Sequence, residues 1–325
     1  MKAGRTFCTL GMLACLTSGS ISVAQTTDDI LFIHHSVGEG WLNDGLRDAL
    51  LAKSYIEEVN EITYGTTVTK DAGRPDSLGI LDPPTQGDFT NINHWLLWFN
   101  DYLQHLKTVD CQSGKNKIIM CKSCFPTSNL YENGTEPGDP FDTYETLVNY
   151  KAVYRHPGEA GHTYTSGTVI YRPLGDVFAA NPDTLFIIVS SPSNVPPSTC
   201  VDYADRARVF WNWLKNDWLN SYNTAHPSLK NVAVFDFFDM LAYPNNFTGT
   251  EVYDPLDDNT TGTYPVRNMT KPAYRNPEDP WDSHPNHLAG QDATRLFTTN
   301  TPNFLDTAYN RWLGTAVESR WPLYR

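Results

Sequence analysis

Residues 29–38 read Asp-Ile-Leu-Phe-Ile-His-His-Ser-Val-Gly, and this stretch decides the class of fold. The apolar run Asp29–Ile33 is short and continuous, as in strands that are buried on both faces of a parallel sheet. His34–Gly38 is expected to form a turn. The helix predicted next, Trp41–Tyr55, places its leucines on one face. A buried strand followed by a turn and an amphipathic helix is the first unit of an α/β sheet.

Four more apolar stretches are predicted to be strands: Val59–Tyr64, Lys117–Cys121, Thr184–Ser190 and Asn231–Phe237. Helical patterns separate or follow these strands, at Asn91–Leu106, Tyr144–Tyr154, Arg172–Ala180, Asp202–Trp218, His287–Phe297 and Phe304–Thr315. Strands that alternate with helices and are apolar throughout predict a parallel sheet with helices on both faces. We therefore expect a three-layer α/β fold with a five-stranded parallel sheet.

Three long stretches rich in Gly, Pro, Asp, Asn or Thr are predicted to be loops: 66–90, 127–142 and 243–283. Each follows a strand or precedes the last helices. Most of this loop sequence should therefore lie at the carboxyl edge of the sheet, where open α/β sheets bind ligands. No stretch has the composition of a linker, and residues 25–325 are predicted to form a single domain.

The first 24 residues have the features of a secretory signal peptide. Lys2 and Arg5 precede an apolar run, and Ser22-Val23-Ala24 supplies a small-x-small cleavage site. A membrane anchor is the alternative, but the apolar run is shorter than the roughly 20 residues that span a bilayer. A lipoprotein site at Cys15 is a second alternative. We expect a secreted or periplasmic protein that is not attached to a membrane once the signal is cleaved.

The charge of the chain limits its partners. The 325 residues include 37 acidic and 24 basic residues, a net charge of −13, and cleavage after Ala24 changes it to −15 because only two basic residues leave. Nucleic acids and anionic membranes attract basic surfaces, so neither is expected as a partner. A small-molecule or polysaccharide substrate is expected instead. The sequence predicts no cofactor and does not indicate an oligomeric state.

Four cysteines follow the predicted signal peptide: Cys111, Cys121, Cys124 and Cys200. An exported protein can form disulfides, so one or two structural disulfides are expected, without a defined pairing. Cys121 and Cys124 have the C-x-x-C spacing of redox and zinc sites. No second C-x-x-C and no nearby histidine pair accompanies them, which disfavours metal or redox use.

Ser36 is the first residue that could carry chemistry. It follows the first strand and precedes a helix, which places its hydroxyl at the carboxyl edge of the sheet beside the N–H groups of the next turn. Such N–H groups can stabilise an oxyanion, and Gly38 allows a tight turn there. The alternative is that Ser36 only caps the helix.

A late polar segment supplies the second piece, His284, which stands just before a predicted helix. A histidine held there, followed by proline, is well placed to accept a proton from a serine hydroxyl. Asp282 or Asp279 could orient its ring. The alternative is a surface histidine in a turn. If Ser36 and His284 meet, they form the nucleophile and the general base of an acyl transfer.

Together these pieces resemble the SGNH (GDSL-type) hydrolase family, in which a serine ends the first strand and a histidine lies near the C-terminus. The residues that carry the resemblance are Leu31–Ser36 and His284-Pro285-Asn286 with Gly290. It covers nearly the whole chain after residue 24 and implies a flavodoxin-like topology. More closely, the chain is similar to a divergent exported branch with His-His-Ser in place of Gly-Asp-Ser. Segments Lys122–Pro126 and Phe235–Phe237 are shared with that branch.

The chain departs from the family pattern in three places, of which the first is His34-His35 where the family has Gly-Asp before the serine. Asp282-x-His284 is one residue shorter than the usual Asp-x-x-His, so either Asp282 reaches the histidine by another backbone path or the enzyme uses a Ser-His dyad. The usual Gly-x-Asn-Asp block is absent. The resemblance therefore implies an oxyanion hole or pocket made from a larger set of residues, namely Gly38, Gly65, Ser123, Asn129, His35 and Lys122.

Other side chains could bind substrate or metal. Trp281 and His34 are predicted to contact substrate, and the loop tyrosines Tyr253, Tyr264 and Tyr274 are further candidates for stacking on sugars. A metal site is the competing interpretation for the histidines, with His34, His35, Asp282, His284 and His287 as possible ligands. The tryptophans at helical spacing are expected in the core.

The sequence as a whole predicts a secreted serine ester hydrolase, with an O-acylated carbohydrate as the expected substrate. A first alternative is a glycosidase or lyase on the same fold, with facing carboxylates such as Asp282 and either Asp254 or Asp257. A second alternative is a carbohydrate-binding protein without catalysis, which the altered Gly-Asp and Asp-x-x-His blocks motivate.

Overall fold

The structure of the protein is a computed structural model. It describes residues 27–63, 92–109, 111, 114–142, 144–155, 163–166, 168–258 and 260–315. The predicted signal peptide, Gly65 and the predicted loop 66–90 lie outside these residues. The predictions made for them are therefore not addressed by the structure.

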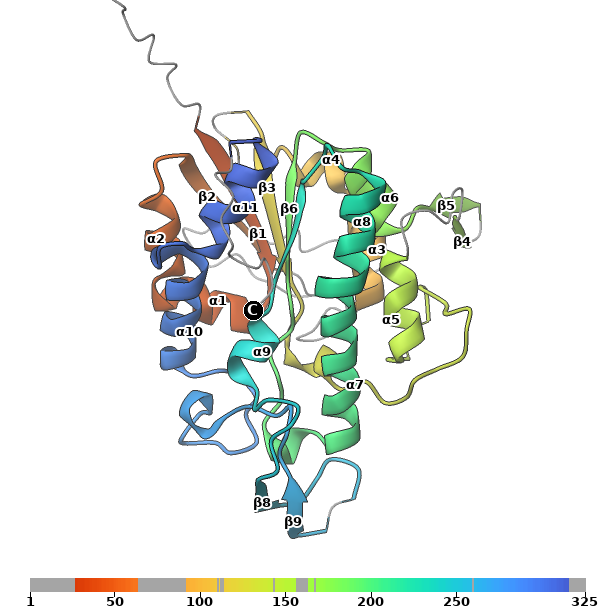
Figure 1. Cartoon of the computed structure of the whole chain (residues 1–325), viewed down its shortest axis with the longest axis vertical. Coiled ribbons are helices and arrows are strands. Elements are labelled where there is room, and N and C mark those ends of the chain that lie inside the picture. The colour runs from red at the N-terminus through yellow and green to blue at the C-terminus, as the bar shows by residue number, and fades with distance from the viewer. Residues whose placement is uncertain are drawn as a thin grey trace, which may run out of the picture.

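A five-stranded, all-parallel sheet forms the centre of the molecule, with the strand order β2-β1-β3-β6-β7 (Figure 1). The strands are β1 (Asp28–His34), β2 (Ile56–Thr63), β3 (Asn116–Lys122), β6 (Leu185–Val189) and β7 (Val232–Phe235). The sequence predicted all five, each with bounds within a few residues. The order is that of a flavodoxin-like topology, and the predicted α/β fold class is confirmed.

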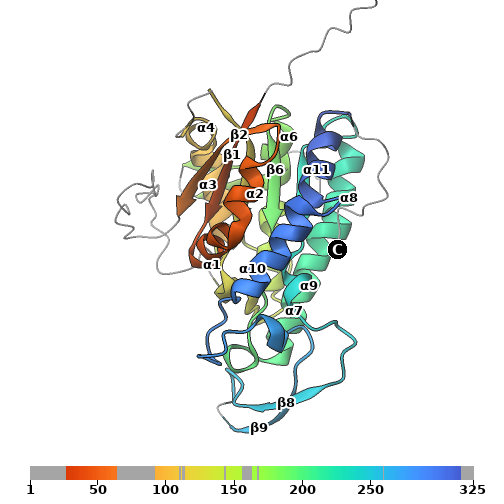
Figure 2. The same cartoon turned by 90° about the vertical axis from the view of Figure 1, so that its left-hand side faces the viewer.

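Helices cover both faces of the sheet, as Figures 1 and 2 show. One face carries α1 (Ser36–Trp41), η1 (Leu42–Leu46), α2 (Arg47–Leu51), α10 (His287–Thr294), η6 (Arg295–Thr299) and α11 (Phe304–Trp312). The other carries α3 (Ile92–Asp101), α4 (Leu103–Leu106), α5 (Leu147–Tyr154), α6 (Leu174–Ala179), α7 (Val201–Asn212), η4 (Trp213–Trp218) and α8 (Leu219–Ala225). Helix α9 (Phe237–Leu241) follows β7 at the carboxyl edge.

The central strand β1 shows why the sequence gives this architecture. Successive side chains of a strand point to opposite faces, so Leu31 and Ile33 enter one core while Ile30 and Phe32 enter the other. Strand β1 pairs in parallel with β2 and with β3, and all four side chains are buried. A continuous apolar run therefore indicates a strand between two helical layers. Because β1 ends at His34, the residues that follow lie at the carboxyl edge of the sheet, where open α/β sheets bind ligands.

The structure corrects the prediction for the segments between the main elements. The stretch 243–283, expected to be loop, contains a hairpin of β8 (Thr250–Tyr253) and β9 (Gly262–Pro265) beyond the carboxyl edge. A second hairpin, β4 (Tyr164–Ser166) with β5 (Val169–Tyr171), was not predicted at all. These strands have only three or four residues each, too few to give a clear period-two pattern. Three short 3₁₀ turns were also not predicted: η2 (Phe125–Ser128), η3 (Pro196–Ser198) and η5 (Pro272–Tyr274).

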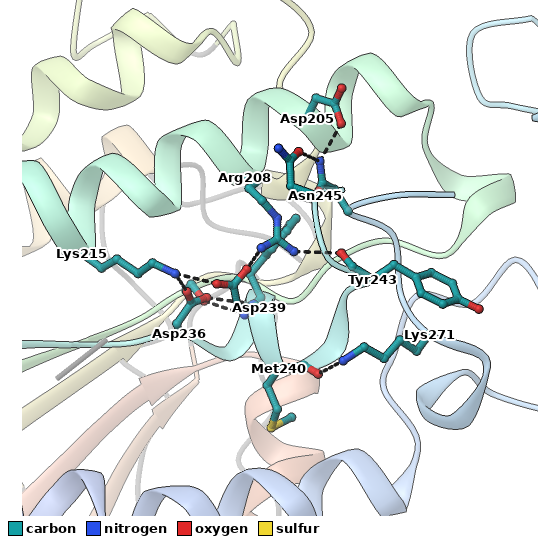
Figure 3. Close-up of polar contacts among 12 residues, drawn as sticks. Asp205, Arg208, Lys215, Asp236, Asp239, Met240, Tyr243, Asn245 and Lys271 are labelled. Carbon is teal, nitrogen blue, oxygen red and sulfur yellow. Dashed lines mark hydrogen bonds and ion pairs between the residues drawn. The ribbon is translucent and has the colours of Figure 1, made fainter. Parts of the chain in front are cut away.

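A buried ionic network joins the long helix α7–η4 to α9 (Figure 3). Lys215 Nζ contacts carboxylate oxygens of Asp236 and of Asp239, the latter at 2.6 Å. Arg208 also pairs with Asp239 and donates to the carbonyl of Tyr243 at 3.0 Å. Asp236 caps α9 through the N–H of Asp239. Two cations and two carboxylates balance, so the network fixes the position of α9 without leaving a buried net charge.

The expected disulfides are not present. Cys111, Cys121, Cys124 and Cys200 are all free thiols. Cys121 belongs to the core on one face of the sheet and Cys124 to the core on the other, so the C-x-x-C pair is separated by the sheet. Cys200 is the N-cap residue of α7, without a capping hydrogen bond from its side chain. Cys111 Sγ accepts a hydrogen bond from Asn60 Nδ2 and donates one to the carbonyl of Lys107, both at 3.9 Å.

In the ranges that the structure covers, no helix has both the length and the apolar character needed to cross a bilayer.

Candidate active site

Ser36 stands at the start of the first helix, immediately beyond the central strand. β1 ends at His34, His35 is the extended N-cap residue, and Ser36 is the first residue of α1. The first N–H groups of a helix have no partner within the helix. The N–H of Ser36 donates to no acceptor in the part of the chain that the structure describes. The hydroxyl and a backbone donor of one residue therefore lie together at the carboxyl edge.

Gly38 allows the tight turn that the sequence predicts after β1. A Cβ on this residue would lie 2.3 Å from Cβ of His34, so only glycine lets the first turn of α1 approach the strand end so closely. Its N–H donates to the carbonyl of His35 at 2.7 Å. A role of Gly38 in the pocket or the oxyanion hole stays a prediction.

His284 connects Ser36 to a carboxylate. His284 Nε2 lies 2.8 Å from Ser36 Oγ, and His284 Nδ1 lies 2.5 Å from Asp282 Oδ1. The same oxygen of Asp282 accepts the backbone N–H of His284 at 2.9 Å. The carboxylate thus folds back on the residue two positions later, which is how the shortened Asp-x-His spacing still brings it to the imidazole.

The ionisation of Asp282 decides which ring nitrogen of His284 carries the proton. Burial alone would raise the pKa of its carboxyl, but hydrogen bonds from the His284 backbone, from Asn276 and from the His284 ring outweigh it and lower the pKa. An ionised carboxylate only accepts hydrogen bonds, so Nδ1 of His284 carries the proton. Nε2 is then left with a lone pair directed at Ser36 Oγ. Asp279, the other predicted acid, instead accepts the N–H of Trp281 and closes the turn.

Three contacts hold the histidine loop in place. Ser283 Oγ accepts the N–H of Val195 at 3.1 Å, which joins the loop to the segment after β6. Asn286 caps α10 by accepting the N–H of Ala289 at 3.2 Å. The ring of Phe125 meets the imidazole edge-on, with 4.9 Å between centroids. The imidazole is therefore fixed by its carboxylate and by neighbours on two other segments.

A small pocket of about 60 Å³ opens beside Ser36 and His284. Its walls include Val37, Gly40, Trp41, Phe237 and Pro285. Trp41 and Phe237 stack with 5.3 Å between ring centroids, which makes one side of the pocket rigid and apolar. A space of this size accommodates a few water molecules or a short acyl group.

Cys124 is a neighbour of the nucleophile that the sequence analysis did not place in the site. Its Sγ lies 3.5 Å from Ser36 Oγ, and the residue is buried. It follows the end of β3 by two residues, and β3 is the sheet neighbour of β1. The signal that could have found it was its position at the carboxyl end of a strand adjacent to β1.

Two residues predicted in the pocket are committed to other contacts. Ser123 is buried, and its Oγ accepts the indole N–H of Trp95 at 2.7 Å. Asn129 donates to the carbonyl of Ser198 at 3.1 Å and accepts from Asn194 at 2.9 Å. Both side chains thus join strand ends and loops, and a pocket role for Ser123 and Asn129 stays a prediction.

Lys122 and His34 lie beneath the site and are closed off from solvent. Lys122 is 1% exposed and donates to the carbonyl of Ser123 at 3.0 Å, and burial lowers its pKa to about 8. His34 is fully buried, and this burial lowers its pKa to about 3, so the ring is neutral. Neither residue lines the pocket. The roles of Lys122 in the pocket and of His34 in substrate contact stay predictions.

Among the aromatic candidates, Trp281 is exposed, whereas the three tyrosines donate hydrogen bonds to other residues of the protein. Trp281 is 53% exposed on the loop that precedes His284, so its indole is available to a substrate. Tyr253 is buried, and its hydroxyl donates to Pro265. Tyr264 and Tyr274 donate to Asp258 and Asp292. The stacking prediction is wrong for the buried Tyr253.

His35 is half-buried, and its carbonyl accepts the N–H groups of Gly38 and Glu39. A pocket role for its side chain stays a prediction.

The residues of the alternative sites have the following contacts. Within the described ranges, no group of three or more His, Cys, Asp or Glu side chains is placed to hold a metal ion. His287, three residues after His284, pairs with Asp44 and with Gln291. The two carboxylate oxygens of Asp282 accept hydrogen bonds from His284 and Asn276. A second carboxylate that faces Asp282 stays a prediction.

The chain was also compared with known proteins. No family model, no curated protein and no solved structure matches it.

Proposed function

We propose that the protein is a secreted serine ester hydrolase of the SGNH type. The observation that carries the proposal is the chain of two contacts from Ser36 Oγ to His284 Nε2 at 2.8 Å and from His284 Nδ1 to Asp282 at 2.5 Å. A nucleophile, a base and an orienting carboxylate in this order are recognised by geometry rather than by sequence position. Their place at the carboxyl edge of a parallel sheet agrees with ligand binding there.

In the proposed first step, Ser36 Oγ attacks the ester carbonyl while His284 Nε2 takes the hydroxyl proton. The carbonyl bond collapses back, the alcohol leaves, and His284 returns the proton to the alcohol oxygen. In the second step, water loses a proton to His284 and attacks the acyl-serine. Ser36 then leaves with that proton, and a carboxylic acid is released. Asp282 stabilises the imidazolium that forms in each step.

The oxyanion formed in both steps requires hydrogen-bond donors. The N–H of Ser36 is the first backbone donor of α1, and η1 continues this helix as far as a kink at Asp44 and Gly45. Backbone N–H groups and the helix dipole favour negative charge at such an amino terminus. We propose this N–H as the first donor. Gly65, the family's expected second donor, lies outside the described residues.

We propose an O-acylated carbohydrate with a short acyl group as substrate, so the enzyme would act as an acetylesterase. The pocket of about 60 Å³ beside Ser36 suits an acetyl group better than a long acyl chain. Trp281 exposes an indole next to the histidine loop, and such surfaces stack well on sugar rings. The predicted signal peptide supports an extracellular or periplasmic location.

Hydrolysis of 4-nitrophenyl acetate by residues 25–325 tests the proposal. Ser36→Ala and His284→Gln should each lower kcat/KM by about 10³-fold or more, because each removes a reacting group. The matched control is His287→Gln, which changes a histidine three residues away that pairs with Asp44. Equal rates for wild type and Ser36→Ala would refute the serine mechanism. Release of reducing ends without release of acetate from an acetylated polysaccharide would favour a glycosidase instead.

A further inference from the structure

The pocket beside Ser36 and His284 holds only a small part of a substrate. Its volume is about 60 Å³, whereas a cavity of roughly 150 Å³ holds one benzene ring. Sites that enclose drug-sized ligands have volumes of roughly 300–1,000 Å³. A sugar alcohol is therefore too large for this pocket, and the acyl group is the part of an ester that fits inside it.

Two stacked aromatic rings limit the size of this pocket. Phe237, the first residue of α9, is 1% exposed, and its ring plane lies at 16° to that of Trp41. Trp41 is itself fixed, because its indole N–H donates to Thr294 at 3.1 Å and Phe235 stacks on it with 5.7 Å between ring centroids. Rings that are packed to the density of a protein core do not move aside easily, so an acyl group cannot lengthen the pocket by displacing them.

The ionic network at the start of α9 holds Phe237 in place. Asp236 precedes Phe237 and caps the helix by accepting the N–H of Asp239 at 2.9 Å. Lys215 bonds to both carboxylates, and Arg208 pairs with Asp239. Figure 3 shows these two cations reaching from the long helix toward α9. Because the network is largely buried, water and salt screen its ion pairs only weakly, and the start of α9 stays beside the pocket.

We propose that Phe237 determines the length of the acyl group that the enzyme accepts. This inference rests on the proposed esterase function, because the acyl chain has to lie beside Ser36 while it is bonded to Oγ. A group of the size of water occupies roughly 30 Å³, so about two carbons beyond the carbonyl fit into the pocket. A longer chain meets the ring of Phe237. Acetyl and propionyl esters are therefore accepted, and esters of longer acids are rejected.

Hydrolysis of 4-nitrophenyl acetate, butyrate and hexanoate by residues 25–325 tests this proposal. The leaving group is the same in all three esters, so differences in kcat/KM report on the acyl group alone. Each methylene group that a pocket cannot accommodate changes kcat/KM by roughly tenfold or more. For the wild type, kcat/KM should therefore fall by at least about tenfold from acetate to hexanoate.

The variants separate Phe237 from the rest of the aromatic core. Phe237→Ala joins the space of a phenyl ring to the pocket, so the ratio of kcat/KM for hexanoate to that for acetate should rise by at least about tenfold. Phe237→Leu keeps an apolar side chain in the core and is the variant for the case that Phe237→Ala does not fold; its ratio should rise by at least about fivefold. The matched control is Phe235→Leu, which also removes a ring that stacks on Trp41 but does not line the pocket. Its ratio should stay within about twofold of the wild type.

Three results would overturn the proposal while leaving the esterase function intact. They are equal kcat/KM of the wild type for acetate and hexanoate, an unchanged ratio in folded Phe237→Leu, or an equal rise of the ratio in Phe235→Leu. A gain of Phe237→Ala on 1-naphthyl acetate without a gain on hexanoate would also overturn it, because the pocket would then hold the alcohol. Hydrolysis of none of the esters by the wild type would instead refute the proposed function, and this inference with it.

Discussion

Replacement of Asp282 by asparagine tests how much the carboxylate contributes. The substitution keeps the size of the side chain but removes the charge that faces His284 Nδ1 at 2.5 Å. It also allows an amide N–H to face the ring, which favours the tautomer with the proton on Nε2, the wrong nitrogen for a base acting on Ser36. Asp282→Asn should therefore lower kcat while leaving the fold intact.

The size of the effect follows from the geometry. A carboxylate and an imidazolium about 4 Å apart interact by roughly 4 kcal/mol at the effective dielectric of a site near the surface. The two side chains are 26% and 37% exposed, so water reduces the useful part to about 3–4 kcal/mol. Since each 1.36 kcal/mol corresponds to a factor of ten in rate, we expect kcat/KM to fall by about 10²–10³-fold.

The assay is hydrolysis of 4-nitrophenyl acetate at pH 7.5, with thermal unfolding as a check on the fold. Asp279→Asn is the matched control, because Asp279 is in the same loop but accepts only the N–H of Trp281 through its side chain. We expect this control to stay within about threefold of the wild type. A rate for Asp282→Asn within threefold of the wild type would show that His284 works without its carboxylate and would refute the proposed role.

Three further substitutions test neighbouring features. Cys124→Ala should reduce kcat/KM by less than tenfold, because the thiol lies 3.5 Å from Ser36 Oγ but is not the proposed nucleophile; a loss as large as that of Ser36→Ala would contradict this. Lys122 has a folded pKa of about 8 against 10.5 unfolded, so the folded state binds fewer protons between these values and wild-type stability should rise with pH there. At pH 7, the free energy of unfolding measured in urea should be about 3 kcal/mol higher for Lys122→Met than for the wild type. A difference between the two proteins that stays constant from pH 7 to 10.5 would contradict this. Lys215→Met removes one of the two cations that face the buried Asp236 and the half-buried Asp239 and should cost about 3–5 kcal/mol. Lys115→Met should cost less than about 1 kcal/mol, because Lys115 and its partner Asp183 are 57% and 56% exposed; similar losses would show that burial does not matter here.

The sheet was predictable from the sequence because four of its strands, β1, β3, β6 and β7, are buried almost throughout, whereas the edge strand β2 is buried only in part. Apolar runs such as Asp29–Ile33 and Thr184–Ser190 can be recognised as strands from their own sequence, without knowledge of the elements that pack against them. The hairpins of β4 with β5 and of β8 with β9 were not predictable in this way. Their few residues are partly exposed, and their pairing depends on where the surrounding loops lie.

The site was predictable only in part, for a related reason. Ser36 and His284 could be found because each stands at the boundary of a strongly patterned element. Whether Lys122 faces the pocket depends on the alternation of side chains along β3, which places it with Ile118 and Met120 beneath the helices. Cys124 follows β3, which the expected flavodoxin-like order places beside β1, but the sequence does not indicate which residue after the strand end turns toward Ser36.

The most direct test of the central proposal is covalent labelling with a fluorophosphonate, followed by peptide mass spectrometry of residues 25–325. The proposed relay predicts one adduct per chain, on Ser36, and no adduct in His284→Gln because the hydroxyl is then not activated. Labelling of Cys124 in place of Ser36 would contradict the account, as would ester hydrolysis by a protein in which Ser36 stays unlabelled.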